Sequence, residues 1–226
     1  MVPMANSIPQ TERRREGLSK ERIVEAAIEI LDSTGESGLT FRALAARLAT
    51  GSGAIYWHVA NKDELLAAAT DHIVARVMAE MAKSAGPREA VRTIALGVFD
   101  AIDVHPWVGA QMQRAPWHTS MLQIFDSIGR QLEALGVPQA AQFDAATALL
   151  SYILGVAGQN ASNARMHGHD PDRAGVLAKT AAHWAQLDAA EYPFVTKVAD
   201  QMNDHDDTAQ FLAGIDLIMA GIEALT

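Results

Sequence analysis

The sequence predicts an all-α protein, and three observations support this prediction. No stretch alternates polar and apolar residues for long enough to form a strand with one buried face. Apolar residues instead recur at helical spacing, as Ile23, Ala27 and Ile30 do in one early stripe. Residue types that commonly cap helix N-termini precede such stripes, among them Ser19 and Thr40. The chain of 226 residues is long enough for one large or two modest helical domains.

Composition and helical pattern divide the chain into three parts. Residues 1–17 are polar, contain a run of arginines, and are expected to form a disordered N-terminal arm. Residues 18–64 are expected to form a compact three-helix unit, and residues 65–226 a larger helical domain. Residues 1–62 carry a net charge of +1, whereas 63–226 carry −10. The front end can therefore approach a polyanion although the whole chain is acidic.

Within the three-helix unit, the pattern predicts two short helices around a tight turn. The first helix of the unit ends near Gly35 and Gly38, and Thr40 caps the second. A break at 49–51 precedes a third helix, which is expected over about 51–59. Two short helices packed on a preceding one form a helix-turn-helix, in which the last helix is the recognition helix.

The recognition helix carries three consecutive ring-bearing side chains, Tyr56, Trp57 and His58. Neighbours on a helix point about 100° apart, so the three cannot all face one core. With Ile55 and Val59 inward, Trp57 and His58 are expected to face outward and Tyr56 to stand at the edge. Such side chains can pack against the sugar–phosphate backbone of DNA while donating to phosphate oxygens. The alternative is a helical hairpin whose aromatic residues are buried in a larger core.

The stretch LSKERIVEAAIEILDSTGESGLTFRALAARLATGSGAIYWHVANKDELL, residues 18–66, resembles the DNA-binding domain of the TetR family of bacterial transcriptional repressors. The segment FLAGIDLIMAGIEAL near the end resembles the last helix of the tetracycline-repressor type of C-terminal domain. The resemblance implies a three-helix DNA-binding domain joined to a helical ligand-binding and dimerisation domain. It also implies a homodimer that binds a palindromic operator in double-stranded DNA and is released by a small-molecule effector.

The resemblance also assigns DNA contacts, although the chain departs from the family pattern in two places. The turn position usually held by glycine is Ala49, which requires a different turn or a strain of about 1 kcal/mol. The reading face at 51–54 has no side chain that could make a bidentate base contact, so specificity would depend on Arg42, methyl contacts and DNA shape. The DNA-contacting positions implied by the resemblance are Thr40, Arg42, Ser52, Ala54, Tyr56, Trp57, His58 and Lys62.

Beyond the recognition helix, a capping box with Asn61 as the cap and Glu64 reaching back starts a long fourth helix. That helix is expected to continue to about Lys83. Further helices are expected over 88–104, 116–134, 139–166 and 207–225, with a short turn at 106–113 and a broken element at 172–203.

Two of these helices, 139–166 and 207–225, are apolar around much of their circumference and need cover on all sides. A second copy of the chain would cover them in a four-helix interface, whereas the alternative is a deeply buried helix in a monomer. The expected interface residues are Leu150, Leu154, Phe211, Ile215, Ile218 and Ile222.

An effector site is expected as a mostly apolar cavity with few polar groups. The candidates are His105, Trp107, Met112, Trp117, Phe125, Tyr152, Gln159, Asn160 and Asn163. Core packing is the alternative for the aromatic residues and Met112, and the solvated end of a helix for the amides. Met78 aligns with the histidine that tetracycline-sensing members place on their fourth helix, which argues against tetracycline with bound magnesium as the effector.

Composition argues against several other classes of protein. The chain has no cysteine, so thiol catalysis, disulfides and thiolate metal sites are excluded. The N-terminus lacks the apolar core of a signal peptide, and the apolar stretch at 145–158 is too short to cross a bilayer, so a cytoplasmic protein without a membrane partner is expected. Loops at 167–170 and 204–207 contain His and Asp, but they are expected to be ordinary polar loops. No metal, cofactor or enzymatic activity is expected. Transcriptional activation and ligand-independent regulation remain open, with a metal-dependent helical enzyme as a remote alternative.

Overall fold

The structure is a computed structural model, and it describes residues 18–114, 118–167 and 173–226. Within these ranges the chain forms helices and no strands, as predicted. The N-terminal helices are α1 (Lys20–Gly38), α2 (Phe41–Arg47) and α3 (Ser52–Tyr56), and α4 (Lys62–Met81) follows them. The remaining elements are α5 (Pro87–Val104), α6 (Pro106–Arg114), α7 (Thr119–Ala134), α8 (Gln139–His167), α9 (Arg173–Ala185), α10 (Pro193–Val198), the 3₁₀-helix η1 (Ala199–Met202) and α11 (Asp207–Glu223).

The expected capping residues begin three of the first four helices. The side chains of Ser19, Thr40 and Asn61 each accept a hydrogen bond from a backbone N–H three residues later. Glu64 reaches back as predicted, since its carboxylate accepts from the N–H of Ala60 at 2.9 Å. The three cap bonds each satisfy a donor that the first turn of a helix leaves unpaired, and the Glu64 bond holds the chain just before the cap.

The end of the third helix differs from the predicted one, whereas the first helix ends at Gly38, as expected. The third helix is shorter than expected and ends at Tyr56 instead of Val59, because a tighter turn follows, in which the N–H of His58 bonds to the carbonyl of Ile55. The first helix has a kink at Gly35, whose φ of 68° lies in the left-handed region that glycine favours. Asp32, before this kink, and Glu36, after it, both bond side chains of α6.

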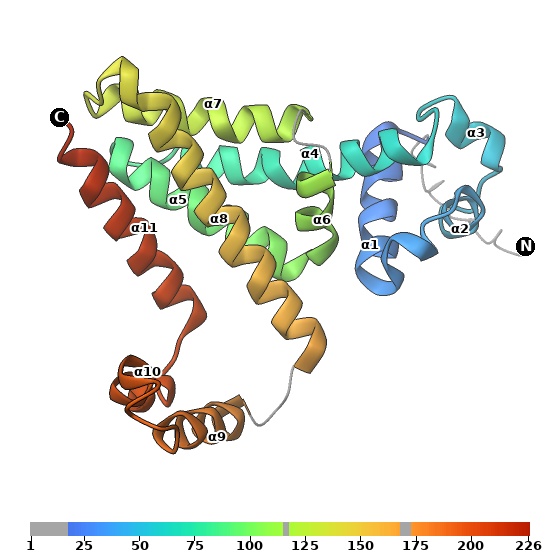
Figure 1. Cartoon of the computed structure of the whole chain (residues 1–226). Coiled ribbons are helices and arrows are strands. Elements are labelled where there is room, and N and C mark those ends of the chain that lie inside the picture. Colours follow the sequence, from blue (N-terminus) through green and yellow to red (C-terminus); the bar gives the residue numbers. More distant parts are fainter. Residues whose placement is uncertain (1–17, 115–117, 168–172) are drawn as a thin grey trace, which may run out of the picture.

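Helix α4 connects the two halves of the molecule (Figure 1). Its start packs with α1, and its later turns contact α5, α6 and α7 in the larger half. Helix α8 lies across α5, α6 and α7, and α11 packs against α5 and α8. The hydrophobic core is continuous through both halves, from Ile23 in α1 to Ile222 in α11.

Helix α8 matches the predicted range 139–166 to within one residue, and it extends beyond the apolar stretch at 145–158. By length and composition alone, Gln139–Asn163 could cross a membrane, and it is the one such helix in the part of the chain that the structure describes. One side of α8 packs on four neighbouring helices, while its other side is exposed in the single chain. The exposed side is therefore available to a partner.

Helices α9, α10 and η1 pack on one another between the ends of α8 and α11. In Figure 1 they lie below the main helical body, away from α1–α4. The prediction of a broken element in this part of the chain is confirmed, because the helices are short and interrupted.

Candidate nucleic-acid interface and effector region

Trp57 faces outward as the spacing predicts, whereas His58 is half-buried and Tyr56 is more exposed than a position at the edge implies. Ile55 and Val59 are buried, and the exposed fraction of each residue is at most 1%. The exposed fraction of Trp57 is 89% and that of Tyr56 is 54%. The ring of Tyr56 stacks on Phe41 of α2 with a centroid distance of 4.2 Å and an angle of 4° between the rings. An almost fully exposed tryptophan contributes nothing to the core, so its apolar surface is available to a binding partner.

The polar candidates around the recognition helix fall into two groups. Arg42 is exposed on the first turn of α2, whereas Ser52 and Ala54 are half-buried on α3. Thr40 is exposed, but its hydroxyl accepts the cap bond from the N–H of Ala43 at 3.1 Å. The hydroxyl of Thr40 can still donate its own proton to a phosphate oxygen while it caps α2.

Lys62 lies at the start of α4 and has a partner within the chain. Its Nζ donates to the backbone carbonyl of Glu36 at 2.5 Å. His58 is half-buried between Trp57 and the start of α4. The Ala60 N–H and then the Lys20 ammonium hold the pKa of the Glu64 carboxyl below its usual value, so Glu64 stays ionised and continues to cap the helix. Lys62 and Lys20 are therefore held in place by a backbone carbonyl and a capping carboxylate.

The turn before the recognition helix keeps its left-handed residue without a glycine. Ala49 has a φ of 51°, the only positive φ at a non-glycine position in the described residues. The N–H of Thr50 bonds to the carbonyl of Ala45 at 3.0 Å across this turn, as in a helix end that closes through a left-handed residue. Of the two options that the sequence left open, the chain has the strained turn.

Two predicted effector residues lie at the junction of the halves, bonded to the first helix. Both His105 Nδ1 and Trp107 Nε1 approach Asp32 Oδ1 of α1, at 2.7 and 2.8 Å. Only 8% of Trp107 is exposed. Asp32 is thus an in-chain partner for both side chains, and a ligand that bonds His105 Nδ1 or Trp107 Nε1 would have to compete with it.

The polar residues of α8 are also not gathered into one cavity. Gln159 and Asn163 are exposed, which corresponds to the solvated helix end that the sequence left open. Asn160 donates to Asp103 at 2.9 Å, and the Tyr152 hydroxyl donates to the carbonyl of Phe211 at 3.2 Å. Burial raises the pKa of the Tyr152 hydroxyl, which remains a proton donor. Of the three amides, Asn160 therefore has a partner within the chain, whereas Gln159 and Asn163 face solvent.

Two hollows lie beside other predicted effector residues. Met112 borders a small enclosed one of about 10 Å³ between α4, α6 and α7, together with Thr70, Gln111 and Met121. Phe125 borders an open groove of about 860 Å³ between α7 and the start of α8. Trp117 lies outside the described residues.

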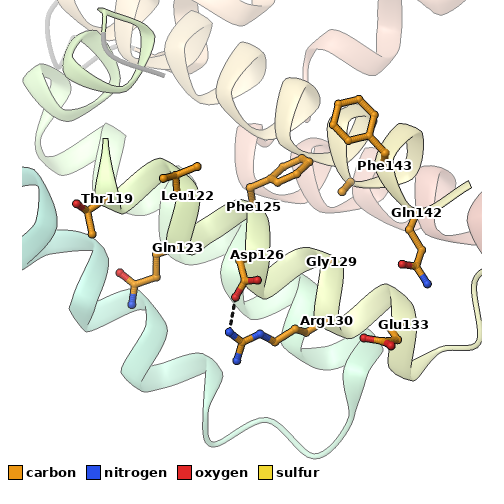
Figure 2. A pocket seen from close by; sticks show the side chains of 11 residues that line it. Thr119, Leu122, Gln123, Phe125, Asp126, Gly129, Arg130, Glu133, Gln142 and Phe143 are labelled. Carbon is orange, nitrogen blue, oxygen red and sulfur yellow. Dashed lines mark ion pairs between the residues drawn. The ribbon is translucent and has the colours of Figure 1, made fainter. Parts of the chain in front are cut away.

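Figure 2 shows the open groove, in which Phe125 and Phe143 lie close together above a row of polar side chains on α7. Their rings meet edge to face with centroids 5.9 Å apart. Phe143 is mostly exposed and Leu122 half so. Phe125 was among the predicted residues, but the groove itself was not predicted, because the angle at which α7 packs on α8 depends on the other helices.

The predicted interface residues divide between the core and the surface. Phe211, Ile215 and Ile222 are buried within the single chain, so the expectation that they face a partner is corrected. They pack inward because α11 lies on α5 and α8. Leu150, Leu154 and Ile218 are half-buried at the edge of the core. Leu217 was not predicted, although 76% of it is exposed.

The loop before α11 has a structural role. Asp206 caps the helix by accepting from the N–H of Ala209 at 2.6 Å. The carboxylate of Asp207 lies 2.9 Å from His205 Nε2 and accepts a hydrogen bond from Arg173 Nη2 of α9 at 2.6 Å. Among the described residues, no three His, Cys, Asp or Glu side chains are placed to hold a metal ion. The loop at 167–170 lies outside the described residues beyond His167.

Comparison with known proteins matches both halves of the chain. Residues 23–69 match the family "Bacterial regulatory proteins, tetR family", and residues 83–226 match "Tetracyclin repressor-like, C-terminal domain". The solved structure of the transcriptional regulator SCO7222, a TetR from Streptomyces coelicolor, is 52% identical, with a TM-score of 0.85 over 92% of this chain and 99% of that one.

Curated proteins agree with these matches. An HTH-type transcriptional regulator of Saccharopolyspora erythraea is 28% identical over 212 residues, which cover 91% of this chain and 87% of that protein. Tetracycline repressor protein class D of Escherichia coli is 46% identical over 59 residues, or 26% of this chain and 27% of that protein. The family matches span most of the chain, and the relatives regulate transcription and are not enzymes. The exposed recognition helix and the helical domain behind it are thus those of a DNA-binding transcriptional regulator, and the chain belongs to the TetR family.

Proposed function

We propose that this chain is a ligand-responsive repressor, which binds a palindromic operator as a homodimer and is released by a small, largely apolar effector. The observation that carries the proposal is the surface formed by Trp57, Tyr56, Arg42 and Lys62. It combines exposed rings with cations at the end of the molecule where the helix-turn-helix lies. The similarity of 59 residues of the chain to tetracycline repressor protein class D supports repression as the direction of control.

Each residue of this surface has a proposed role that follows from its chemistry. Trp57 and Tyr56 pack against sugar and phosphate, and Lys62 and His58 donate to phosphate oxygens. Arg42 is exposed and long enough to reach a guanine edge in the major groove. Thr40 and Ser52 each supply one hydroxyl contact, and Ala54 supplies a methyl contact with thymine. Phosphate contacts then supply most of the affinity and Arg42 most of the base preference.

The exposed sides of α8 and α11 are proposed as the dimer interface. On α11 the exposed residues include Leu217, Ala213 and Gly221, and on α8 they include Ser151 and Gly155. Small residues allow two helices to approach closely, and an exposed leucine among them favours a second apolar surface. Leu150, Leu154 and Ile218 lie at the edge of this surface, where a partner would complete their burial.

The effector is proposed to bind between α4, α6 and α7, around the small hollow beside Met112. Its present volume of about 10 Å³ holds no more than a water molecule. A ligand of ordinary size therefore has to displace α6 or α7, and the flexible side chains of Met112 and Met121 can rearrange around it. A ligand that displaces these helices prefers a conformation different from the free one, as release from DNA requires.

The proposal is tested by selecting duplexes from random DNA with the purified protein. We expect enrichment of an inverted repeat with half-sites about one helical turn apart, or a multiple of that distance. Light scattering of the free protein should give the mass of two chains. Recovery of no preferred sequence, or of a site without two-fold symmetry, would refute the palindromic operator. A single-chain mass would refute the dimer.

A further inference from the structure

Two carboxylates near the end of α1 bind four side chains on or beside α6. Asp32 receives His105 and Trp107, as described above. Both carboxylate oxygens of Glu36 accept from Arg114 Nη1, at 3.0 and 3.1 Å. Gln111 Nε2 lies 3.5 Å from Glu36 Oε2. We call Asp32, Glu36, His105, Trp107 and Arg114 the α1–α6 latch. It joins residues 73 to 78 positions apart in the sequence, from opposite halves of the molecule.

The latch supplies a second attachment where the two halves otherwise share a single helix. Helix α4 runs through both halves, so its bending would change the angle between the recognition helix and the larger half. Helix α6 contacts both α1 and α4, and it holds α1 at a point away from the axis of α4. A body held at two separate points cannot tilt about either one alone. The latch therefore limits the motion that α4 by itself would allow.

The other side of α6 lies in the core of the larger half. Trp107, Val108 and Met112 are buried, and Met112 borders the small hollow between α4, α6 and α7. Gly109 lies so close to α5 that an added Cβ would come within 3.1 Å of Ile102. Because α6 has only nine residues, its buried and its latched sides move together.

The latch also continues to the DNA-binding surface. The backbone carbonyl of Glu36 accepts from Lys62 Nζ at 2.5 Å, while the side chain of the same residue binds Arg114. One residue of α1 therefore contacts a proposed phosphate-binding cation and α6 at the same time. A displacement of Glu36 would move the partner of Lys62 as well.

We propose that Asp32 and Glu36 are positioning residues for DNA binding, which fix the recognition helix relative to the larger half through α6. The inference rests on the proposed function, since a fixed angle matters only to a protein that has to place two recognition helices in successive grooves. Asp32 and Glu36 act without touching DNA. Both repel phosphate, so simple electrostatics predicts that removing either one strengthens binding.

The first test uses this opposition of signs. Glu36→Lys should weaken binding to the selected duplex about fivefold or more, although it adds positive charge. Adding Arg114→Glu should reform the ion pair in reverse and restore affinity to within about twofold. Glu25→Lys is the matched control, because it makes the same charge change at an exposed position of α1 outside the latch, and it should bind as well as wild type or better. If Glu36→Lys binds like Glu25→Lys, or the reversed pair does not recover, the proposal is overturned.

A second test needs neither DNA nor a dimer. The chain has no cysteine, so Ala46→Cys on α2 and Ala134→Cys on α7 provide two unique sites for spin labels at exposed positions. Labelled protein is mixed with an excess of unlabelled protein so that distances within one chain are measured. We expect one narrow distance distribution, a broad or shifted one with Glu36→Lys, and a narrow one with Glu25→Lys. An unchanged distribution with Glu36→Lys would refute the latch. A protein that shows the expected distributions but selects no DNA would refute the proposed function and leave the latch standing.

Discussion

Two tryptophans of this chain lie in opposite environments. Trp57 follows α3 and extends into solvent with 89% of its surface exposed, and its indole N–H has no hydrogen-bond partner among the described residues. Trp107 on α6 is 8% exposed and donates its indole N–H to Asp32. The first has a surface that only a partner can use, whereas the second has satisfied both its apolar and its polar groups within the chain. An aromatic residue therefore indicates a binding site only when its environment leaves it without partners.

The same difference separates the two halves of the molecule. At the DNA-binding end, the direction of the outward residues follows from their spacing on two short helices, α2 and α3. In the larger half, most predicted ligand and interface residues are buried or bonded to residues far away in the sequence, as Tyr152 is to Phe211. Four pairs of variants test this contrast, and one variant tests the turn before the recognition helix. The largest effect is expected for the first pair and the smallest for the turn.

The largest effect is expected on α11. Ile215→Asp would place an unpaired charge in the core of the single chain, and it should lower the free energy of unfolding by about 4 kcal/mol or more. Leu217→Asp, two residues later, changes a side chain that is 76% exposed and should leave the fold intact while it weakens the dimer. Thermal unfolding and light scattering of both variants separate the two effects. A folded Ile215→Asp protein, or a dimeric Leu217→Asp protein, would contradict the division of α11 into core and partner sides.

The two tryptophans themselves give the second test. Trp107→Ala removes a buried ring and should lower the free energy of unfolding by about 3–5 kcal/mol. Trp57→Ala should leave stability within about 0.5 kcal/mol of wild type and weaken operator binding, because the lost contact lies outside the fold. Denaturant unfolding and fluorescence anisotropy with the selected duplex measure the two quantities. Equal losses of stability in the two variants would remove the contrast.

Lys62 and Arg42 divide the DNA-binding end more finely. Lys62→Ala should weaken binding to all duplexes about equally and reduce the slope of log affinity against log salt by about 1. Arg42→Ala should cost about 1–3 kcal/mol at one base position and relax the preference there. Titrations of both variants against the selected duplex and its single-base variants, at several salt concentrations, separate these outcomes. A change of base preference in Lys62→Ala but not in Arg42→Ala would reverse the assigned roles.

A pH effect is expected where α5 meets α11. Hydrogen bonding to the Arg92 guanidinium, at 2.5 Å, and the nearby Arg88 charge hold the pKa of the Asp216 carboxyl below its usual value of 3.8. A carboxyl whose pKa is lowered by folding stabilises the fold above its unfolded pKa, and this contribution is lost as the pH falls through the folded pKa. Asp216 is partly exposed, so the contribution should be about 1 kcal/mol or less.

Asp216→Asn provides the measurement. The variant should unfold at a lower temperature than wild type at pH 7, and the difference should shrink as the pH is lowered below 3.8. Asp126→Asn is a suitable control, because the Asp126 pair with Arg130 lies within α7 and does not join two helices. A difference between wild type and Asp216→Asn that is constant from pH 7 to the acid range would contradict the assignment.

The smallest effect is expected at the turn before the recognition helix. Ala49→Gly should relieve the left-handed strain at a φ of 51° and raise the free energy of unfolding by about 0.5 kcal/mol. The gain is small because glycine also has more freedom in the unfolded chain. Operator affinity should stay within about twofold of wild type, since Ala49 precedes the recognition helix. A loss of stability in Ala49→Gly would show that the turn is not strained.

The sequence by itself determined the elements and the DNA-binding surface. Caps at Ser19, Thr40 and Asn61 and the inward pair Ile55 and Val59 are relations between residues a few positions apart. Helical geometry converts such spacings directly into direction, so the exposure of Trp57 could be predicted. The helix boundaries of the larger half follow from the same local patterns, with α8 and α11 within a few residues of the expected ranges.

Only the tertiary structure decided which apolar faces of the larger half are covered and which polar groups are already bonded. His105 and Trp107 are bonded to Asp32 across more than 70 positions, and Ile215 faces the core because of how α11 crosses α5 and α8. Neither relation has a local signature, since the packing of several helices at once sets the contact. A helix that is apolar on several faces can turn any of them inward, and long-range packing alone makes that choice.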